Sequence, residues 1–134
     1  SNIKDAVNWN VPVVGLQDSL RAVIEKMVAE NISSLVVKSD NSVVGLISEM
    51  DVLDCIVANK DLESARVADY LTRCELITGQ PVKSPCAQLD ESESVANALK
   101  VLAAAGTHNL LVSGEGDKKV GIATLHNLLR LVLA

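Results

Sequence analysis

Apolar residues recur along the chain with two different periods, and their alternation predicts an order of helices and strands. Two segments carry apolar residues three and four positions apart, the spacing of one face of an amphipathic helix. These apolar positions are Leu20, Val23, Ile24, Met27 and Val28 in the first half of the chain and Val95, Ala98, Leu99, Leu102 and Ala103 in the second. Asp18 or Ser19 is the candidate N-cap of the first helix, and Ser92 or Ser94 that of the second.

Shorter apolar runs bounded by turn residues predict strands around these helices. The sequences DNS and GEGDKK supply turns between consecutive runs. The predicted strands cover residues 11–16, 35–37, 43–47, 87–89, 110–113 and 120–123, and the predicted final helices cover 49–58 and 125–132. The order β-α-β-β-α therefore occurs twice, which predicts an α+β fold.

The chain repeats its own sequence. VGLISEMDVL at 44–53 and VGIATLHNLL at 120–129 share one pattern, and the offset between Gly45 and Gly121 is 76 residues. NISSLVV matches THNLLVS at the same offset, SLRAVIEKM matches SVANALKVL at an offset of 75, and IKDAV near the start matches VADYL. An ancestral duplication explains these matches.

We place the first repeat at residues 1–62 and the second at 63–134. The second repeat carries about eleven additional residues around LITGQPVKSPC, where two Pro and one Gly predict a loop. A half of this length buries too little apolar surface to be stable alone. We therefore expect the two repeats to share one core across a pseudo-twofold axis.

The composition excludes several classes of partner. The chain has 134 residues, of which 49 % are hydrophobic, as expected for a folded domain. Its net charge is −5 and only 1 % of its residues are aromatic, so it repels phosphates and offers bases little to stack on. No apolar run reaches the roughly 18–20 residues that span a bilayer, and the charge disfavours anionic membrane surfaces. We expect neither nucleic acid nor a membrane as partner.

Metal and catalytic chemistry are also not expected. The three cysteines lack CxxC spacing and the chain has two histidines, which predicts no zinc site and no disulfides. We expect reduced, packed thiols and a cytoplasmic protein. The chain has no Gly-rich phosphate loop followed by Lys, no GxSxG and no HExxH. The sequence therefore does not predict an enzyme.

The duplicated motif places polar groups at the start of a helix. Ser48 lies where a predicted strand meets a predicted helix, and the free amides there stabilise an anion such as a phosphate. Asp51, about one turn further, has a carboxylate that can accept hydrogen bonds from the two vicinal hydroxyls of a ribose. The pattern therefore suits a nucleotide. It equally fits a capping box in which Ser48 and Asp51 only bind the helix backbone, and Thr124 can likewise be only an N-cap.

Two copies of a G-h-h-[ST]-x-x-D pattern, GLISEMD at 45–51 and GIATLHN at 121–127, connect the chain to a family. In this motif and in the order of its elements, nearly the whole chain resembles a tandem CBS-domain pair, also called a Bateman module. The resemblance implies a regulatory module, commonly homodimeric, that binds an adenosine-type ligand in the cleft between its repeats. It also implies a fused or partner effector protein that the module controls.

The resemblance assigns roles to single residues of the motif. In such pairs the Asp holds the ribose and the Ser/Thr region approaches the phosphates, which implies these roles for Asp51 and Ser48. The second repeat has Thr124 and Asn127 at the matching positions. Thr78 falls near the strand that lines the adenine pocket of the family.

The change from Asp51 to Asn127 predicts two unequal sites. A hydrogen bond from a sugar hydroxyl contributes roughly 1.5–3 kcal/mol to a carboxylate but about 0.5–1.5 kcal/mol to a neutral acceptor. We therefore expect the Asn127 site to bind about five- to thirty-fold more weakly than the Asp51 site.

Residues before the middle strand bear on the charge of the ligand. Asn109 lies eighteen residues before Asn127, and Ser33 lies eighteen before Asp51. In similar pairs, such as the gamma subunit of AMP-activated protein kinase, a His-Arg at this place reaches the phosphates. Here His108 is present but Asn109 replaces the Arg. The resemblance then implies a less charged ligand such as AMP or another adenosyl compound, while a hydrogen-bonded strand end is the alternative role for His108.

Two functional hypotheses remain open at this point. The first is a regulatory module that senses an AMP-like ligand. The second is a ligand-free CBS module that serves only for dimerisation or docking in a larger enzyme or transporter. The missing Arg and the replacement by Asn127 favour the second hypothesis, and the intact motif around Asp51 favours the first.

Overall fold

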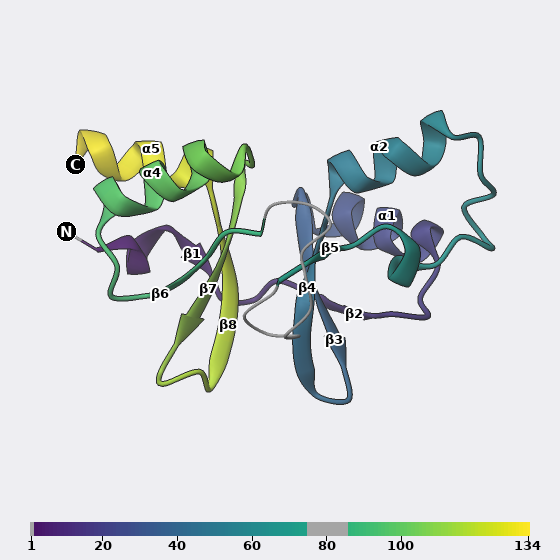
Figure 1. Ribbon diagram of the computed structural model, residues 1–134, viewed down its shortest axis with the longest axis horizontal. Coiled ribbons are helices and arrows are strands. Elements are labelled where there is room, and N and C mark those ends of the chain that lie inside the picture. The colour runs from purple at the N-terminus through teal and green to yellow at the C-terminus, as the bar shows by residue number, and fades with distance from the viewer. Residues whose placement is uncertain (1, 75–85) are drawn as a thin grey trace. The chain divides into compact units, whose positions relative to one another are not determined.

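The computed structural model describes residues 2–74 and 86–134. These residues form two compact units, drawn in Figure 1. Unit 1 combines Ser1–Asn10 with Pro85–Ala134, and unit 2 consists of Val11–Ser84. Each unit contains one four-stranded sheet and two α-helices.

Unit 2 is built around the sheet β2-β3-β4-β5. Its elements are β2 (Val13–Gly15), α1 (Leu20–Glu30), β3 (Ser34–Ser39), β4 (Ser42–Ser48), α2 (Glu49–Val57), the 3-10 helix η2 (Val67–Asp69) and β5 (Thr72–Arg73). Strand β2 runs parallel to β3, while β4 is antiparallel to both β3 and β5. The helices and long strands confirm the elements predicted for the first repeat.

Unit 1 repeats this arrangement in the sheet β1-β8-β7-β6. Its elements are η1 (Ile3–Ala6), β1 (Val7–Asn8), β6 (Gln88–Asp90), α4 (Val95–Ala105), β7 (Asn109–Gly114), β8 (Lys119–Thr124) and α5 (Leu125–Leu133). Strand β6 is parallel to β7, and β8 is antiparallel to β7 and β1. The β-α-β-β-α order is thus confirmed in both repeats.

Helix starts follow the predicted caps. Ser19 Oγ accepts a hydrogen bond from the Ala22 amide at 3.1 Å, and Ser94 Oγ accepts one from the Asn97 amide at 3.1 Å. Ser19 and Ser94 are therefore the N-caps, rather than the alternatives Asp18 and Ser92.

The short N-terminal segments of the two repeats are exchanged between the units. Segment η1–β1 comes from the first repeat but pairs with β8 of the second, and η2–β5 comes from the second but pairs with β4 of the first. Two isolated bridges mark the same exchange, because Asn2 pairs with Ser94 and Arg66 pairs with Ser19. The compact units therefore do not coincide with the sequence repeats.

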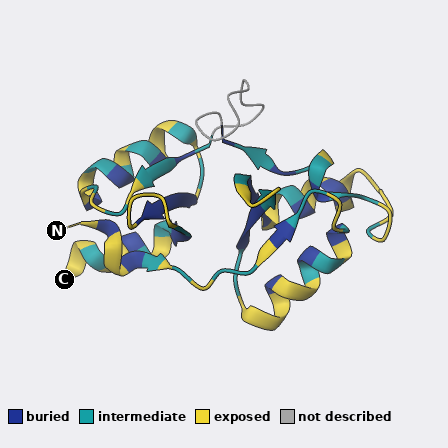
Figure 2. Ribbon diagram, turned by 90° about the horizontal axis from the view of Figure 1, so that it is seen from below, coloured by how far each residue is buried: buried dark blue, intermediate teal, exposed yellow. Residues whose placement is uncertain are grey.

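Buried apolar residues form two clusters instead of the single shared core that we expected. The cluster of unit 2 includes Leu20, Leu35 and Ile47, and that of unit 1 includes Leu110 and Leu128. The exchanged segments contribute directly, since Val67 belongs to the first cluster, and Ile3 and Ala6 belong to the second. In Figure 2 each helix carries buried residues on one side and exposed residues on the other. The exchange enlarges each unit beyond what its own repeat segment supplies, so each has a cluster of its own.

The motif glycines allow the exchanged strands to approach. A Cβ atom on Gly45 would lie 2.1 Å from the backbone oxygen of Thr72 in β5. A Cβ atom on Gly121 would lie 2.5 Å from the backbone oxygen of Asn8 in β1. Both distances are far below van der Waals contact. The Val-Gly element that the chain repeats is therefore explained by edge-strand pairing in each sheet.

The two hairpins differ, and the sequence offset of the middle strand is wrong by one residue as a result. Ser34 lies opposite Ser48 and Asn109 lies opposite Thr124, so Asn109 corresponds to Ser34, not to the predicted Ser33. The β3–β4 hairpin shifts register between Val37 and Lys38, a shift that the other hairpin lacks, and the two hairpins have turns of different length. These differences move the offset from 75 in the strand to 76 in the motif.

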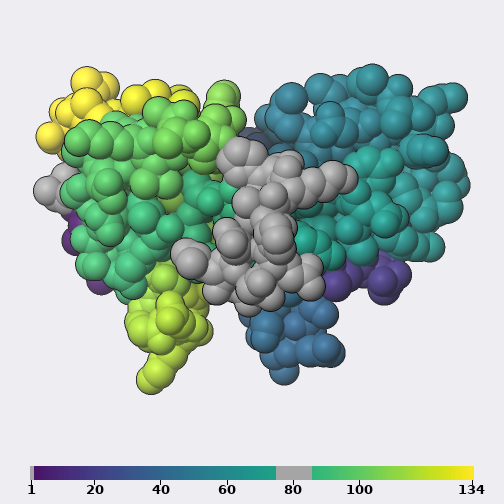
Figure 3. Space-filling model, in the orientation of Figure 1, coloured from purple at the N-terminus to yellow at the C-terminus, as the bar shows by residue number. Residues whose placement is uncertain are grey.

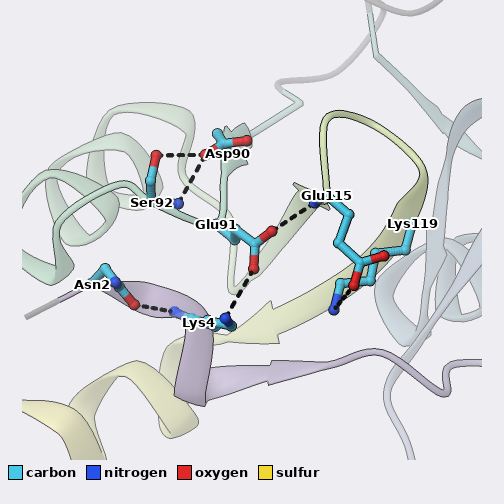
Figure 4. A network of polar contacts seen from close by, with 7 residues as sticks. All are labelled: Asn2, Lys4, Asp90, Glu91, Ser92, Glu115 and Lys119. Atoms are coloured by element: carbon cyan, nitrogen blue, oxygen red, sulfur yellow. Dashed lines mark hydrogen bonds and ion pairs between the residues drawn. The ribbon is translucent and has the colours of Figure 1, made fainter.

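A polar network in unit 1 fixes the exchanged N-terminal segment (Figure 4). Glu91, just after β6, accepts a hydrogen bond from the Glu115 amide at 2.7 Å and lies 3.9 Å from Lys4 Nζ in η1. Lys119 Nζ is 3.6 Å from Glu115 and 4.1 Å from the centre of the Trp9 ring. Trp9 packs against the unit 1 core, which agrees with a packing role for this residue rather than base stacking.

Two of the cysteines differ from the expectation. Cys55 is free and completely buried in the core of unit 2, as a packed thiol should be. Cys74 and Cys86, in contrast, each take part in a disulfide. This corrects the prediction of three reduced thiols, on which the predicted cytoplasmic location depended.

Candidate functional site

In unit 2, three of the predicted site residues meet at the start of α2. Strand β4 ends at Ser48, which is the N-cap of α2. The Ser33 carbonyl, just before β3, accepts a hydrogen bond from the Glu49 amide at 3.0 Å. Asp51 lies in the first turn of the helix. The antiparallel pairing of β3 with β4 therefore brings Ser33, Ser48 and Asp51 to one end of the sheet.

Asp51 binds the backbone at its own helix start. Its Oδ2 accepts hydrogen bonds from the Ser48 amide at 2.8 Å and from Ser48 Oγ at 3.2 Å. Ser48 and Asp51 thereby form a capping box, the structural alternative raised by the sequence. The carboxylate has a second oxygen, Oδ1, so this capping role leaves an acceptor atom that a ligand hydroxyl can use.

Burial shifts the titration of Asp51. Loss of solvent raises the pKa of this half-buried carboxyl above its ordinary value of 3.8, the Ser48 hydrogen bonds act in the opposite direction, and the Asp54 charge raises it further. The charged form is therefore less favourable in the folded protein than in the unfolded chain.

This shift predicts a pH dependence that Asp51→Asn removes. Because the folded pKa lies above the unfolded pKa, ionisation destabilises the fold as the pH rises from 3.8 through the folded pKa. We expect the free energy of unfolding of wild type, relative to Asp51→Asn, to fall over that interval and then level off. Urea titrations of both proteins at a series of pH values measure this difference. A difference that does not change with pH contradicts the expected shift.

In unit 1, the four predicted residues of the second repeat gather in the same way at the start of α5. The His108 carbonyl accepts a hydrogen bond from the Leu125 amide at 2.8 Å, as Ser33 does for Glu49 in unit 2. Asn109 is buried at the start of β7, opposite Thr124. Thr124 is the N-cap of α5, and its Oγ1 accepts a hydrogen bond from the Asn127 amide at 3.2 Å.

The two helix starts therefore use different capping contacts. In unit 2 the acidic side chain of Asp51 caps the Ser48 amide, whereas in unit 1 the Thr124 hydroxyl caps the Asn127 amide. Within residues 2–74 and 86–134, the side chain of Asn127 has no hydrogen bond to the protein. Both clusters offer a polar side chain one turn into a helix, but only the cluster of unit 2 offers a carboxylate.

Other predictions fall outside these clusters or were missed. Thr78 lies outside the described residues. His108 is solvent-exposed, and its hydrogen-bonded carbonyl fits the strand-end role proposed as the alternative. Ser34 was not predicted, although it is buried opposite Ser48 at the position that corresponds to Asn109. The unequal lengths of the two turns were the only sequence signal for that one-residue correction.

Comparison with known proteins identifies the family. The family model of the CBS domain matches the chain twice, at residues 3–58 and 79–134. The chain belongs to the CBS-domain family. It is a tandem CBS pair, and the two matches carry the two G-h-h-[ST]-x-x motifs. No curated protein matches this CBS pair in sequence.

Solved structures of other CBS proteins share the fold. An uncharacterised conserved protein from Pyrococcus horikoshii is 24 % identical, with a TM-score of 0.80 over 98 % of this chain and 92 % of that one. CBSX2, solved in complex with AMP, is 23 % identical, with a TM-score of 0.70 over 98 % and 96 % of the two chains. The CBS domain pair of MJ0100, solved with 5′-methylthioadenosine and S-adenosyl-L-methionine, is 19 % identical, with a TM-score of 0.77 over 98 % and 99 %.

Neither a metal centre nor a membrane helix is found in the described part of this CBS pair. Residues 2–74 and 86–134 contain no group of three or more His, Cys, Asp or Glu placed to hold a metal ion. No helix within those ranges is both long enough and apolar enough to cross a bilayer. The matched family is regulatory, and no catalytic family is indicated.

Proposed function

We propose that this CBS pair is a regulatory module that binds an AMP-like adenosine ligand at the helix start formed by Ser33, Ser48 and Asp51. The observation that carries the proposal is the Asp51 carboxylate, held in the first turn of α2 through one oxygen while the other stays available. The ligands of CBSX2 and of the MJ0100 pair support the adenosine class, since AMP, 5′-methylthioadenosine and S-adenosyl-L-methionine all carry a ribose.

The chemistry of the cluster suits the sugar of such a ligand. An ionised carboxylate accepts hydrogen bonds from both hydroxyls of a ribose more strongly than a neutral acceptor does. The capping contacts from Ser48 fix the Asp51 side chain before a ligand arrives, which lowers the entropy cost of binding. The first amides of α2 add positive partial charge for one phosphate.

The second cluster is proposed as a weaker site for the same class of ligand. Asn127 offers an amide oxygen at the position of Asp51, and Thr124 takes the place of Ser48. Neither cluster has an arginine or lysine within it, so we propose a ligand with one phosphate or none. Triphosphates are expected to bind less well because their charge would be uncompensated in a chain of net charge −5.

A ligand panel tests the proposal. Thermal unfolding with AMP, S-adenosyl-L-methionine and ATP is expected to show stabilisation by the first two, by about 2.7 kcal/mol when the ligand is at a hundred times its Kd. ATP is expected to stabilise less. Mass spectrometry of the small molecules released from the freshly purified, denatured protein is expected to detect an adenosine compound. No stabilisation by any of the three at millimolar concentration would contradict the proposal.

A ligand-free dimerisation or docking module is the second candidate. It is favoured by the capping box, because Ser48 and Asp51 already have a structural role. Under this alternative the chain responds to none of the three nucleotides, yet still self-associates or binds an effector protein. In either case we propose that the chain acts as a homodimer.

A further inference from the structure

Helix α2 carries a stripe of apolar side chains that no described residue covers. Leu53, Ile56 and Val57 are 45 %, 51 % and 75 % exposed. Their spacing of three and four residues places them on one face, while Val52 and Cys55 face the core of unit 2. Isolated exposed apolar residues are ordinary, but a continuous stripe on a helix indicates an interaction surface.

Helix α5 carries the same stripe at corresponding positions. Leu129, Val132 and Leu133 are 48 %, 57 % and 90 % exposed. Each lies 76 residues after its counterpart in α2, which is the offset of the duplicated motif. Figure 3 shows the C-terminal helix α5, in yellow, at the surface of its unit. Three exposed apolar positions have therefore been kept in both repeats, although most of the surrounding residues differ.

One charged position beside the stripe has opposite sign in the two helices. Asp54 follows Leu53 in α2, and Arg130 follows Leu129 in α5, again 76 residues apart. Both side chains belong to exposed residues, and by helical geometry each flanks its stripe on the same side. An acidic and a basic residue thus border two otherwise similar apolar surfaces.

We propose that these stripes pack against each other between two copies of this chain, with α2 of one copy on α5 of the other. A twofold axis makes the contact reciprocal, so that both stripes of both copies become buried. The charges select this pairing over α2 on α2 and α5 on α5. In the mixed pairing Asp54 lies beside Arg130 of the other copy, whereas the like pairings bring two Asp54 or two Arg130 side chains together.

This inference specifies the contact surface of the homodimer and does not depend on nucleotide binding. A chain that binds no adenosine ligand can still dimerise in this way, and a monomer can still bind one. Sedimentation equilibrium in the absence of nucleotide therefore tests the surface separately from the proposed function.

The first experiment tests the stripe with two matched valines. Val57 in α2 and Val28 in α1 are 75 % and 76 % exposed, but only Val57 belongs to a stripe. We expect Val57→Lys to weaken dimerisation at least about tenfold, because two charges are buried per dimer. Val28→Lys is expected to leave it unchanged. A wild-type chain that stays monomeric, or equal effects of the two substitutions, would overturn the proposal.

The second experiment tests which helices meet. Asp54→Arg and Arg130→Asp, made singly, each place like charges opposite one another in the mixed pairing, and we expect dimerisation to weaken about five- to tenfold. The double variant restores opposite charges and is expected to dimerise like wild type. In the like pairings the single variants only exchange one repulsion for another. Single variants that dimerise as well as wild type therefore refute the contact between α2 and α5, and circular dichroism checks that each variant is folded.

Discussion

Gly45→Ala and Gly121→Ala are each expected to lower the free energy of unfolding by about 1–3 kcal/mol, the range of overpacked sites. An added methyl group would lie 2.1 Å from the Thr72 oxygen in the first case and 2.5 Å from the Asn8 oxygen in the second. Because both obstacles are backbone atoms, no change of rotamer relieves the clash. The edge strand β5 or β1 has to move away, which disrupts its pairing with β4 or β8.

Gly15→Ala is the matched control for these two variants. Its added methyl group would meet only the Asp18 carboxylate, at the ordinary contact distance of 3.9 Å. We expect its stability to equal that of wild type or to exceed it slightly, since alanine restricts the unfolded chain. Urea denaturation followed by circular dichroism measures all three variants. If the three lose the same stability, the close approach of the edge strands does not explain the repeated glycine.

Asp51→Ala is expected to weaken AMP binding by about 10- to 150-fold, the effect of losing a hydrogen bond to a charged group. Asn127→Ala is expected to weaken the second site only about two- to tenfold, because a neutral acceptor contributes less. Isothermal titration calorimetry resolves the two classes of site when their affinities differ to this extent. Loss of binding in the Asn127 variant alone would assign the ligand to the wrong repeat.

The control for Asp51→Ala has to separate binding from capping. Removal of the Asp51 carboxylate also removes the contacts to Ser48, at a cost of about 1 kcal/mol in stability. Glu49→Ala removes an exposed acidic residue from the same first turn of α2 without touching the capping box. We expect this control to bind AMP like wild type. Equal losses of affinity in the two variants would show that the charge of the helix start matters and not the Asp51 contact.

The sequence predicts the long elements of this fold because they have strong local signals. The amphipathic periods of α1 and α4, and the apolar runs of β3, β4, β7 and β8, all appear where expected. The duplication then supplies the symmetry of the two repeats. Capping at Ser19 and Ser94 follows from local side-chain chemistry, so the sequence narrows each cap to two candidates.

Long-range contacts are the part that the sequence does not predict. Strands β1 and β5 have two residues each, too few for any period, and their partners lie far away in the chain. The match of IKDAV with VADYL indicates that these segments correspond but not that they are exchanged. The single shared core and the equivalence of Ser33 with Asn109 were wrong for the same reason, since both depend on pairing across the sheet. The disulfide state of Cys74 and Cys86 likewise depends on folding, not on spacing.

The exchange of short segments between the units has a consequence for how this protein can be divided. A cut between the repeats would give two fragments, each lacking the strand and helical turn that close its sheet, and each left with an open edge beside Gly45 or Gly121. Two such fragments are complementary, so mixing them should reconstitute the whole, whereas one alone can be completed only by a second molecule of itself. A single ancestral repeat would have met the same requirement, and gene duplication then placed both partners on one polypeptide.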